Sequence, residues 1–352
     1  MRIPGRCRAG RPELLANAVS LLVLIAGTQI AARGSLPWSP AAWATPWSGD
    51  IVLVTAGLLF LGLGFLTPLH AGMVNLALYA QFLAGFALAT AVTRATGMDP
   101  AARAGLSIVA GAGAGMLVGA LVVWLRRRFA VHELLSGLLL AGALLPLARA
   151  TAVATTTPPA LTLQLSLLTD PLHLGPALAL PRKLVLAWGI LLLSLGLVIT
   201  ILLAHFLRAS ARGLELRVLG ANPPAAIAAG VNVDRVQLLT MVVGGACGGM
   251  CGALQLWTQS AVALERWPLP LAFAGLTMVC YALGSLRGLV LVAAVFTAWI
   301  TVPGTMAALA VPGLGALVAL LLVLPALWIL PRPTPDQGSP RAAWRTRHRE
   351  PF

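Results

Sequence analysis

Long apolar runs alternate with short polar segments along almost the whole chain. A run of about 20 apolar residues is long enough to cross the hydrocarbon core of a bilayer as a helix. We expect ten spans, at about 14–32, 51–69, 71–92, 104–125, 131–150, 184–207, 236–256, 270–284, 288–302 and 314–330. The pattern therefore predicts an all-α, polytopic transmembrane bundle of about 10 spans (8–10) over 14–330. The polar ends, 1–13 and 331–352, are predicted to be tails, the second one disordered.

The polar segment 214–235, between two long runs, carries a helix signal of its own. Asn222 suits an N-cap, Pro223 suits the first helical position, and Gly230 suits a left-handed C′ position. Helix-favouring residues fill most of the segment between them: Ala225, Ala226, Ile227, Ala228 and Ala229. The pattern predicts a helix of about two turns, flanked by Arg217 and Arg235. Such a helix either connects two spans at the membrane surface or presents itself to a partner.

Composition places the chain among membrane proteins. Hydrophobic residues make up 59% of it and charged residues only 10%, which is more apolar surface than a soluble domain can hide. Strand-like alternation is absent, which argues against a membrane barrel.

The net charge of +14 first suggests a nucleic-acid partner. No basic stripe with interleaved aromatic residues supports that interpretation, and basic residues beside spans follow the positive-inside rule. Most of the 24 Lys and Arg residues fall on one side of the ten-span topology. That side holds both termini, Arg126–Arg128 and 214–235, so we expect these to be cytoplasmic and 151–183 to lie outside. No nucleic acid is expected as a partner.

Two amides interrupt the apolar run at 71–92. A buried amide requires hydrogen-bond partners, so Asn75 and Gln81 must be satisfied within the protein or by a solute. They are six residues apart and do not share a helix face unless the helix breaks between them. The two interpretations are a broken helix that lines a substrate path and plain hydrogen bonding between helices.

One carboxylate lies at the start of a span with apolar sequence on both sides. Glu133 follows His132 and is five residues beyond the basic cluster Arg126–Arg128, which offers it partners. It is either a gate near the cytoplasmic mouth of a path or a solvated helix N-terminus, where a negative charge is favourable.

The chain lacks the motifs of several other functional classes. There is no GxxxxGK[ST] phosphate loop, HExxH or GxSxG, so neither ATP hydrolysis nor membrane hydrolase chemistry is expected here. No acidic relay crosses the spans, which weakens a gradient-driven transporter. Cys247 and Cys251 share a helix face without a completing His or acid, so they are interpreted as small packing residues. No metal site and no cofactor are predicted.

Four segments together resemble the membrane permease subunits of ABC importers for simple sugars, nucleosides and branched-chain amino acids, with the nucleoside-type permeases most similar. They lie at 61–89, 131–140, 212–235 and 271–296, in the family's order. The matching positions are Gly72, Asn75, Gln81, Glu133, Gly213, Arg217, Gly220, Asn222, Pro223, Ala225, Ala226, Ala229, Gly230, Phe273, Gly275, Gly284 and Gly288. Tyr79 and Ala80 stand where the family has Glu-Gly, His132 replaces an Asn, and His70 stands where an Arg is common.

The resemblance implies a function and a set of partners. The chain would translocate a small polar solute such as a nucleoside or simple sugar across a bacterial inner membrane. Partners would be ABC ATPase subunits, a second permease protomer, an external solute-binding protein and the lipid bilayer. The resemblance also assigns two sites: a coupling helix at Asn222–Gly230 that docks on the ATPase, and a path or gate at Asn75, Gln81 and Glu133.

Two alternatives remain at the level of sequence. One is a gradient-driven transporter or channel, which would take up solute without an ATPase. The other is a structural subunit of a membrane complex, which would carry no transport. We further expect that replacing Ala226 with Asp disrupts docking while leaving membrane insertion intact.

Overall fold

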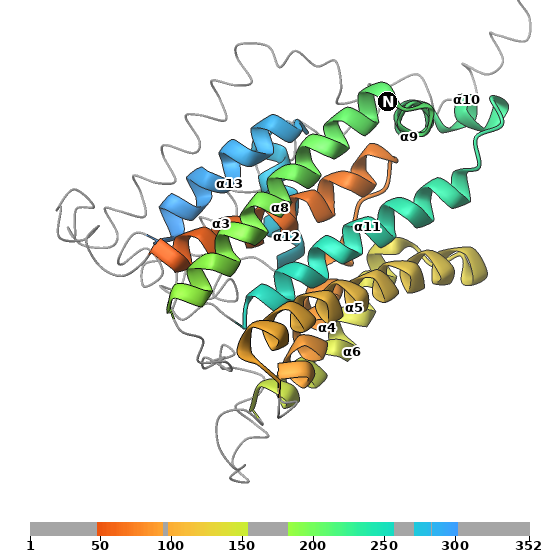
Figure 1. The fold of residues 1–352 in the computed structure, drawn as a ribbon. Helices are drawn as coiled ribbons and strands as arrows, with labels where there is room; N and C mark the ends of the chain where they lie inside the picture. The colour runs from red at the N-terminus through yellow and green to blue at the C-terminus, as the bar shows by residue number, and fades with distance from the viewer. Residues whose placement is uncertain (1–47, 94–97, 154–181, 257–270, 283, 302–352) are drawn as a thin grey trace, which may run out of the picture.

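A computed structural model describes residues 48–93, 98–153, 182–256, 271–282 and 284–301, and these residues are almost entirely helical (Figure 1). The helices are α3 (Ser48–His70), α4 (Leu78–Thr93), α5 (Pro100–Phe129), α6 (Glu133–Val153), α8 (Arg182–Ala209), α9 (Ala211–Ala221), α10 (Pro223–Ala228), α11 (Val233–Leu254), α12 (Leu271–Tyr281) and α13 (Leu286–Thr301). No strand occurs among them, so the prediction of an all-α bundle is confirmed. The predicted tails and the runs at 14–32 and 314–330 lie outside the described residues.

Four of these helices are long and apolar enough to cross a membrane: α3, α5, α8 and α11. The pair α12 and α13 counts as a fifth if its two helices, bent by 116° at the break between them, form one span. Residues Leu78–Thr93 and Leu135–Ala148 form shorter apolar helices, where the sequence predicts complete spans. The total of about ten spans therefore stays a prediction.

Helix α3 is the centre of the bundle. Leu58, Phe60, Leu61 and Phe65 are all fully buried, on every side of the helix, because neighbouring helices surround it. It packs against α11, α8, α12 and α13, and Figure 1 shows it running between α8 and α11. An evenly apolar helix of this kind is what a fully enclosed position requires.

Helices α5 and α11 approach so closely that their backbones touch. A Cβ added at Gly115 would lie 2.0 Å from the carbonyl oxygen of Gly245, and one at Gly249 would lie 2.0 Å from that of Gly111. Such small-residue seams allow helices to pack tightly where lipid supplies no hydrophobic driving force. The sequence predicts close-packing surfaces from the recurring glycines of the runs at 104–125 and 236–256, and the structure packs these two surfaces against each other. Gly113 is different, because a Cβ there would meet nothing within 4 Å.

Cys247 and Cys251 also lie on α11. Both are buried and free, at 4% and 0% exposure. This agrees with their interpretation as small packing residues.

Candidate functional site

Of the two interpretations of Asn75 and Gln81, the structure has the helix interrupted before Gln81. Helix α3 ends at His70, α4 begins at Leu78, and the intervening turn bends through Gly72, whose φ is +76°. Asn75 lies in this non-helical segment and Gln81 lies one turn into α4. The run that the sequence predicts as one span at 71–92 is therefore a seven-residue connection followed by a short helix.

The two amides are brought together by this break. The Asn75 Nδ2 donates to Gln81 Oε1 at 3.0 Å, and the Gln81 Nε2 donates to Asn75 Oδ1 at 3.3 Å. Both side chains are 0% exposed. Gly248 on α11 leaves room for Gln81, because a Cβ at Gly248 would lie 3.1 Å from the Gln81 Cβ. The amides thus satisfy each other in the interior of the bundle.

Asn75 has a second role, which depends on a proline in α3. In a regular helix the N–H of residue 68 would bond to the carbonyl of Gly64, but Pro68 has no N–H. The Asn75 Nδ2 donates to that free Gly64 carbonyl at 3.0 Å. A buried carbonyl without a partner is costly, and more so in a membrane. Asn75 therefore repairs the gap that Pro68 leaves. The four-residue spacing of Gly64 and Pro68 was the sequence signal for this contact.

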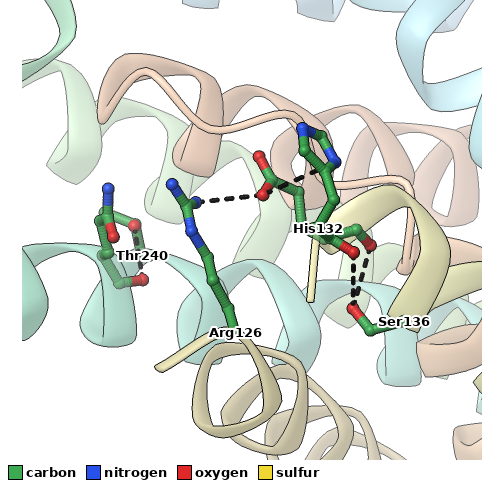
Figure 2. Close-up of polar contacts among 6 residues, drawn as sticks. Arg126, His132, Ser136 and Thr240 are labelled. Carbon is green, nitrogen blue, oxygen red and sulfur yellow. Dashed lines mark hydrogen bonds and ion pairs between the residues drawn. The ribbon is translucent and has the colours of Figure 1, made fainter. Parts of the chain in front are cut away.

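Glu133, the predicted gate residue, begins α6 and is 8% exposed. Its Oε2 lies 3.1 Å from Nη1 of Arg126 and 3.9 Å from Nδ1 of His132. Figure 2 shows Arg126 and His132 extending toward this carboxylate from two different elements. The ion pair joins the end of α5 to the start of α6, as the sequence suggested.

Glu133 and the amide pair are connected through α6. One turn after Glu133, Gly137 packs on the α3–α4 connection, where a Cβ at Gly137 would lie 2.8 Å from the Cα of Ala77. The path and gate candidates thus form one contiguous region of the protomer, in which the Asn75–Gln81 pair and the Arg126–Glu133 pair are separate contacts.

The predicted short helix in the polar segment is confirmed, together with its caps. The Asn222 side chain accepts from the N–H of Ala225 at 3.3 Å, and Pro223 is the first residue of α10. Gly230 has a φ of +79°, and the N–H of Val231 bonds back to the carbonyl of Ala226 at 3.0 Å. This is a Schellman-type ending, in which a left-handed glycine closes the helix.

The preceding residues, 211–221, form a helix as well. Ser210 caps α9 by accepting from the N–H of Gly213 at 2.9 Å. This helix was not predicted from the sequence. We call α9 and α10 together the cytoplasmic arm, after the side of the membrane on which the charge pattern predicts this segment to lie.

The cytoplasmic arm packs directly on the α3–α4 connection. A Cβ at Gly220 would lie 2.2 Å from the carbonyl oxygen of His70, and Gly72 lies on the other side of this contact. Buried apolar side chains complete the joint, with Ala71 from the connection, Leu219 from α9 and Ala226 from α10 in one cluster. The arm and the turn that leads to Asn75 therefore form a single packed unit.

Ala226 faces into this unit and not outward. It is 0% exposed, so an aspartate there would place a charge in an apolar cluster and disturb folding. The prediction that Ala226→Asp disrupts docking while leaving insertion intact is therefore a poor test, because loss of docking and loss of folding would look alike. The side chain that α10 presents outward is Ile227, at 62% exposure.

The other residues predicted for the docking site also divide into exposed and buried ones. Asn222, Pro223, Ala225, Ala229 and Gly230 are exposed, whereas Gly220 is buried and Arg217 is half-buried. Ile227 was not among the predicted site residues, because the family pattern leaves its position unspecified. The local signal was present, since Ile227 is the one large aliphatic side chain between Asn222 and Gly230.

A second ionic contact joins the end of α5 to the start of α11. The Arg127 Nε lies 3.5 Å from Oδ1 of Asp234, and its Nη2 donates to the Asp234 carbonyl. The sequence did not connect these two residues, which are 107 positions apart.

Comparison with known proteins gives two matches and one negative result. The family described as branched-chain amino acid transport system / permease component matches residues 49–330. A guanosine ABC transporter permease protein, NupP of Bacillus subtilis (strain 168), is 24% identical over 287 residues, covering 78% of this chain and 79% of its own. No solved structure matches.

The family match extends over most of the chain and includes the amide pair, Glu133 and the cytoplasmic arm. The helical fold and the apolar spans agree with it. The chain therefore belongs to the family of permease components of branched-chain amino acid transport systems.

Proposed function

We propose that this permease subunit carries a nucleoside, or a similar small polar solute such as a simple sugar, into a bacterial cell. The substrate class is supported by the similarity to a guanosine permease over 78% of the chain. ATP hydrolysis belongs to a separate ATPase subunit, since the chain has no phosphate-binding loop. Family membership further implies an external solute-binding protein. We place two permease protomers in the transporter and both termini in the cytoplasm.

The observation that carries the proposal is the construction of the cytoplasmic arm. Helix α10 is short, capped at both ends, and anchored through Ala226, while Ile227 projects from it at 62% exposure. An apolar side chain held outward on a fixed polar segment is suited to a pocket in a protein partner. We assign α10 as the helix that docks on the ATPase, with Ile227 as its anchor.

The packing of the arm suggests how a partner's movement reaches the membrane. Gly220 contacts His70, and the chain continues from there through Gly72 to Asn75. Because these backbones are in contact, the arm cannot shift without moving the α3–α4 connection. Alternating access requires two states whose balance the ATPase changes. In this mechanism the connection is the element that differs between them.

The docking assignment is tested by placing a charge on the exposed face of α10. Ile227→Asp is expected to lower co-purification with the ATPase by about tenfold or more, because loss of a buried anchor costs about 2 kcal/mol. The thermal unfolding midpoint of the isolated permease should not change, since the side chain is exposed in the protomer. Ile227→Leu is the matched control and should retain the ATPase.

Ala226→Asp provides the contrast, because it should lower the unfolding midpoint as well as co-purification. Full retention of the ATPase by Ile227→Asp would refute docking through α10.

We also propose that Asn75, Gln81 and Glu133 border the solute path. The support is their position. The two amides are buried at the α3–α4 connection, and the carboxylate lies on α6, which packs against that connection. In this conformation the amides satisfy each other, so solute reaches them in the state in which the connection has moved.

Glu133→Gln tests the gate. The variant keeps the shape of the side chain and removes its charge, so pairing with Arg126 weakens. Nucleoside uptake by cells that express the full transporter should fall several-fold, while ATPase co-purification stays unchanged. An uptake rate equal to that of the wild type would remove Glu133 from the path. Glu133→Asp, which keeps the charge, should retain part of the uptake.

A further inference from the structure

A groove of about 830 Å³ runs between α8 and α11, apart from the amide pair and from Glu133. Its walls are apolar side chains such as Leu202 and Phe206 on α8 and Leu239 and Val243 on α11. Thr67 of α3 lines its floor, which agrees with the position of α3 between these two helices in Figure 1. Its volume is within the usual range of ligand sites, about 300–1,000 Å³.

One end of this groove is charged. Arg212, Glu215 and Arg235 line it where α8 has ended and α11 begins. In the part of the chain that the structure describes, the ion pairs are Arg126–Glu133, Arg127–Asp234 and His132–Glu133. Neither arginine of the groove takes part in one. The end of the groove thus presents two cations against one carboxylate.

Apolar walls with a basic end are suited to a ligand that has an apolar chain and an anionic head. An apolar channel along two membrane-spanning helices accepts an acyl chain, and basic residues at the end of such helices attract an anionic headgroup. Leu202 and Leu239 are 60% and 52% exposed, so the walls are open to an occupant in this protomer. We propose that the groove binds an anionic phospholipid, with an acyl chain between α8 and α11 and its phosphate beside Arg212 and Arg235.

A small polar solute would not suit the same place, because most of the lining is apolar and the charged groups, Arg212, Glu215 and Arg235, lie at one end. The lipid assignment does not depend on the docking role of α10. The choice of leaflet follows from the side on which the arm lies. Gly230, Val231 and Asn232, which follow α10, also line the groove, so a cytoplasmic arm places the lipid in the inner leaflet.

The experiment is native mass spectrometry of the purified full-length chain, with the subunits that co-purify, titrated with phosphatidylglycerol or phosphatidylcholine of the same acyl chains. The wild type should bind phosphatidylglycerol several-fold more tightly. Arg212→Gln combined with Arg235→Gln should weaken that binding by about tenfold, because each basic contact near the surface contributes severalfold. Arg208→Gln is the matched control, since Arg208 is exposed on α8 but does not line the groove.

Two more variants separate lipid binding from loss of fold. Glu215→Gln removes the one carboxylate and should tighten phosphatidylglycerol binding, a change that misfolding does not produce. Leu239→Trp should fill the groove and weaken binding of both lipids, whereas Leu191→Trp, at an exposed position of α8 outside the groove, should not.

Equal affinity for the two lipids would overturn the proposal, as would an unchanged affinity in the double arginine variant. Insensitivity to Leu239→Trp would do so too, and would fit a groove that another segment of the chain covers. If Ile227→Asp retains the ATPase and so refutes docking through α10, these lipid affinities are unaffected. The two proposals therefore fail separately.

Discussion

The cytoplasmic arm and the α3–α4 connection are both interruptions between apolar helices, and they are built in opposite ways. Each uses a glycine at positive φ, Gly230 at +79° and Gly72 at +76°. The arm satisfies its ends with neighbours three to five residues away, such as Asn222 with Ala225. The connection is completed by distant partners, since Asn75 reaches back eleven residues to Gly64 in another helix.

The difference follows from the surroundings of the two segments. Helix α10 and its caps are largely exposed, so water can satisfy any group that the caps leave free. The connection is buried in a membrane bundle, where each polar group needs a partner in the protein. The comparison teaches that an exposed interruption can be built from local sequence, whereas a buried one requires the tertiary structure. Substitutions in the connection should therefore lower the stability of the whole protein, whereas substitutions at the caps of α10 should lower the stability of that helix alone.

The largest effect is expected at Asn75. Asn75→Ala leaves the Gly64 carbonyl and the Gln81 amide without this partner, at about 1–3 kcal/mol for each group. The thermal unfolding midpoint of the detergent-solubilised protein should fall clearly. Asn75→Ala combined with Gln81→Ala should cost less than the sum of the two single changes, because the second change removes a group that the first has orphaned. Strict additivity would show that the amides do not interact.

A smaller effect is expected where the two regions meet. Gly220→Ala places a methyl group 2.2 Å from the His70 carbonyl oxygen, so the arm must move away from the connection. Overpacking of this kind costs about 1–3 kcal/mol, measured as a loss of unfolding free energy or a lower midpoint. Transport should fall more than ATPase co-purification, because Ile227 is still presented.

Gly113→Ala is the matched control for that change. It makes the same substitution in a helix at a position where the new Cβ meets nothing within 4 Å. It should leave stability unchanged or raise it slightly, since alanine favours helix over glycine. Equal destabilisation by Gly113→Ala and Gly220→Ala would show that the arm and the connection are not packed as described.

The smallest effect on the whole protein is expected at Asn222. Asn222→Ala removes the N-cap of α10, which costs about 1 kcal/mol in the stability of that helix alone. The global unfolding midpoint should stay within error, while hydrogen exchange of the α10 amides becomes faster. Asn222→Ser retains a capping side chain and should behave as the wild type. A large fall in the midpoint would contradict the local character of the arm.

Particular residues show how far sequence reasoning extends. The caps at Asn222 and Gly230 were predicted because capping depends on residues within a few positions of each other. The glycine seams of α5 and α11 were predicted as close-packing surfaces, but not as partners, because spacing along one helix does not say which helix it meets. Ile227 was missed, and Ala226 was assigned to the wrong face, since a two-turn helix has too few residues for its buried side to be read from a pattern.

The sequence by itself determined the membrane character, the helical class, the need of Asn75 and Gln81 for hydrogen-bond partners, and the short capped helix. These follow from apolar run length, from the cost of a buried amide and from local capping. The tertiary structure decided that Asn75 completes the carbonyl freed by Pro68, that Gly220 joins the arm to the connection, and that α8 and α11 leave a groove between them. Each of these is a contact between segments distant in the chain, and its existence depends on which helices are neighbours.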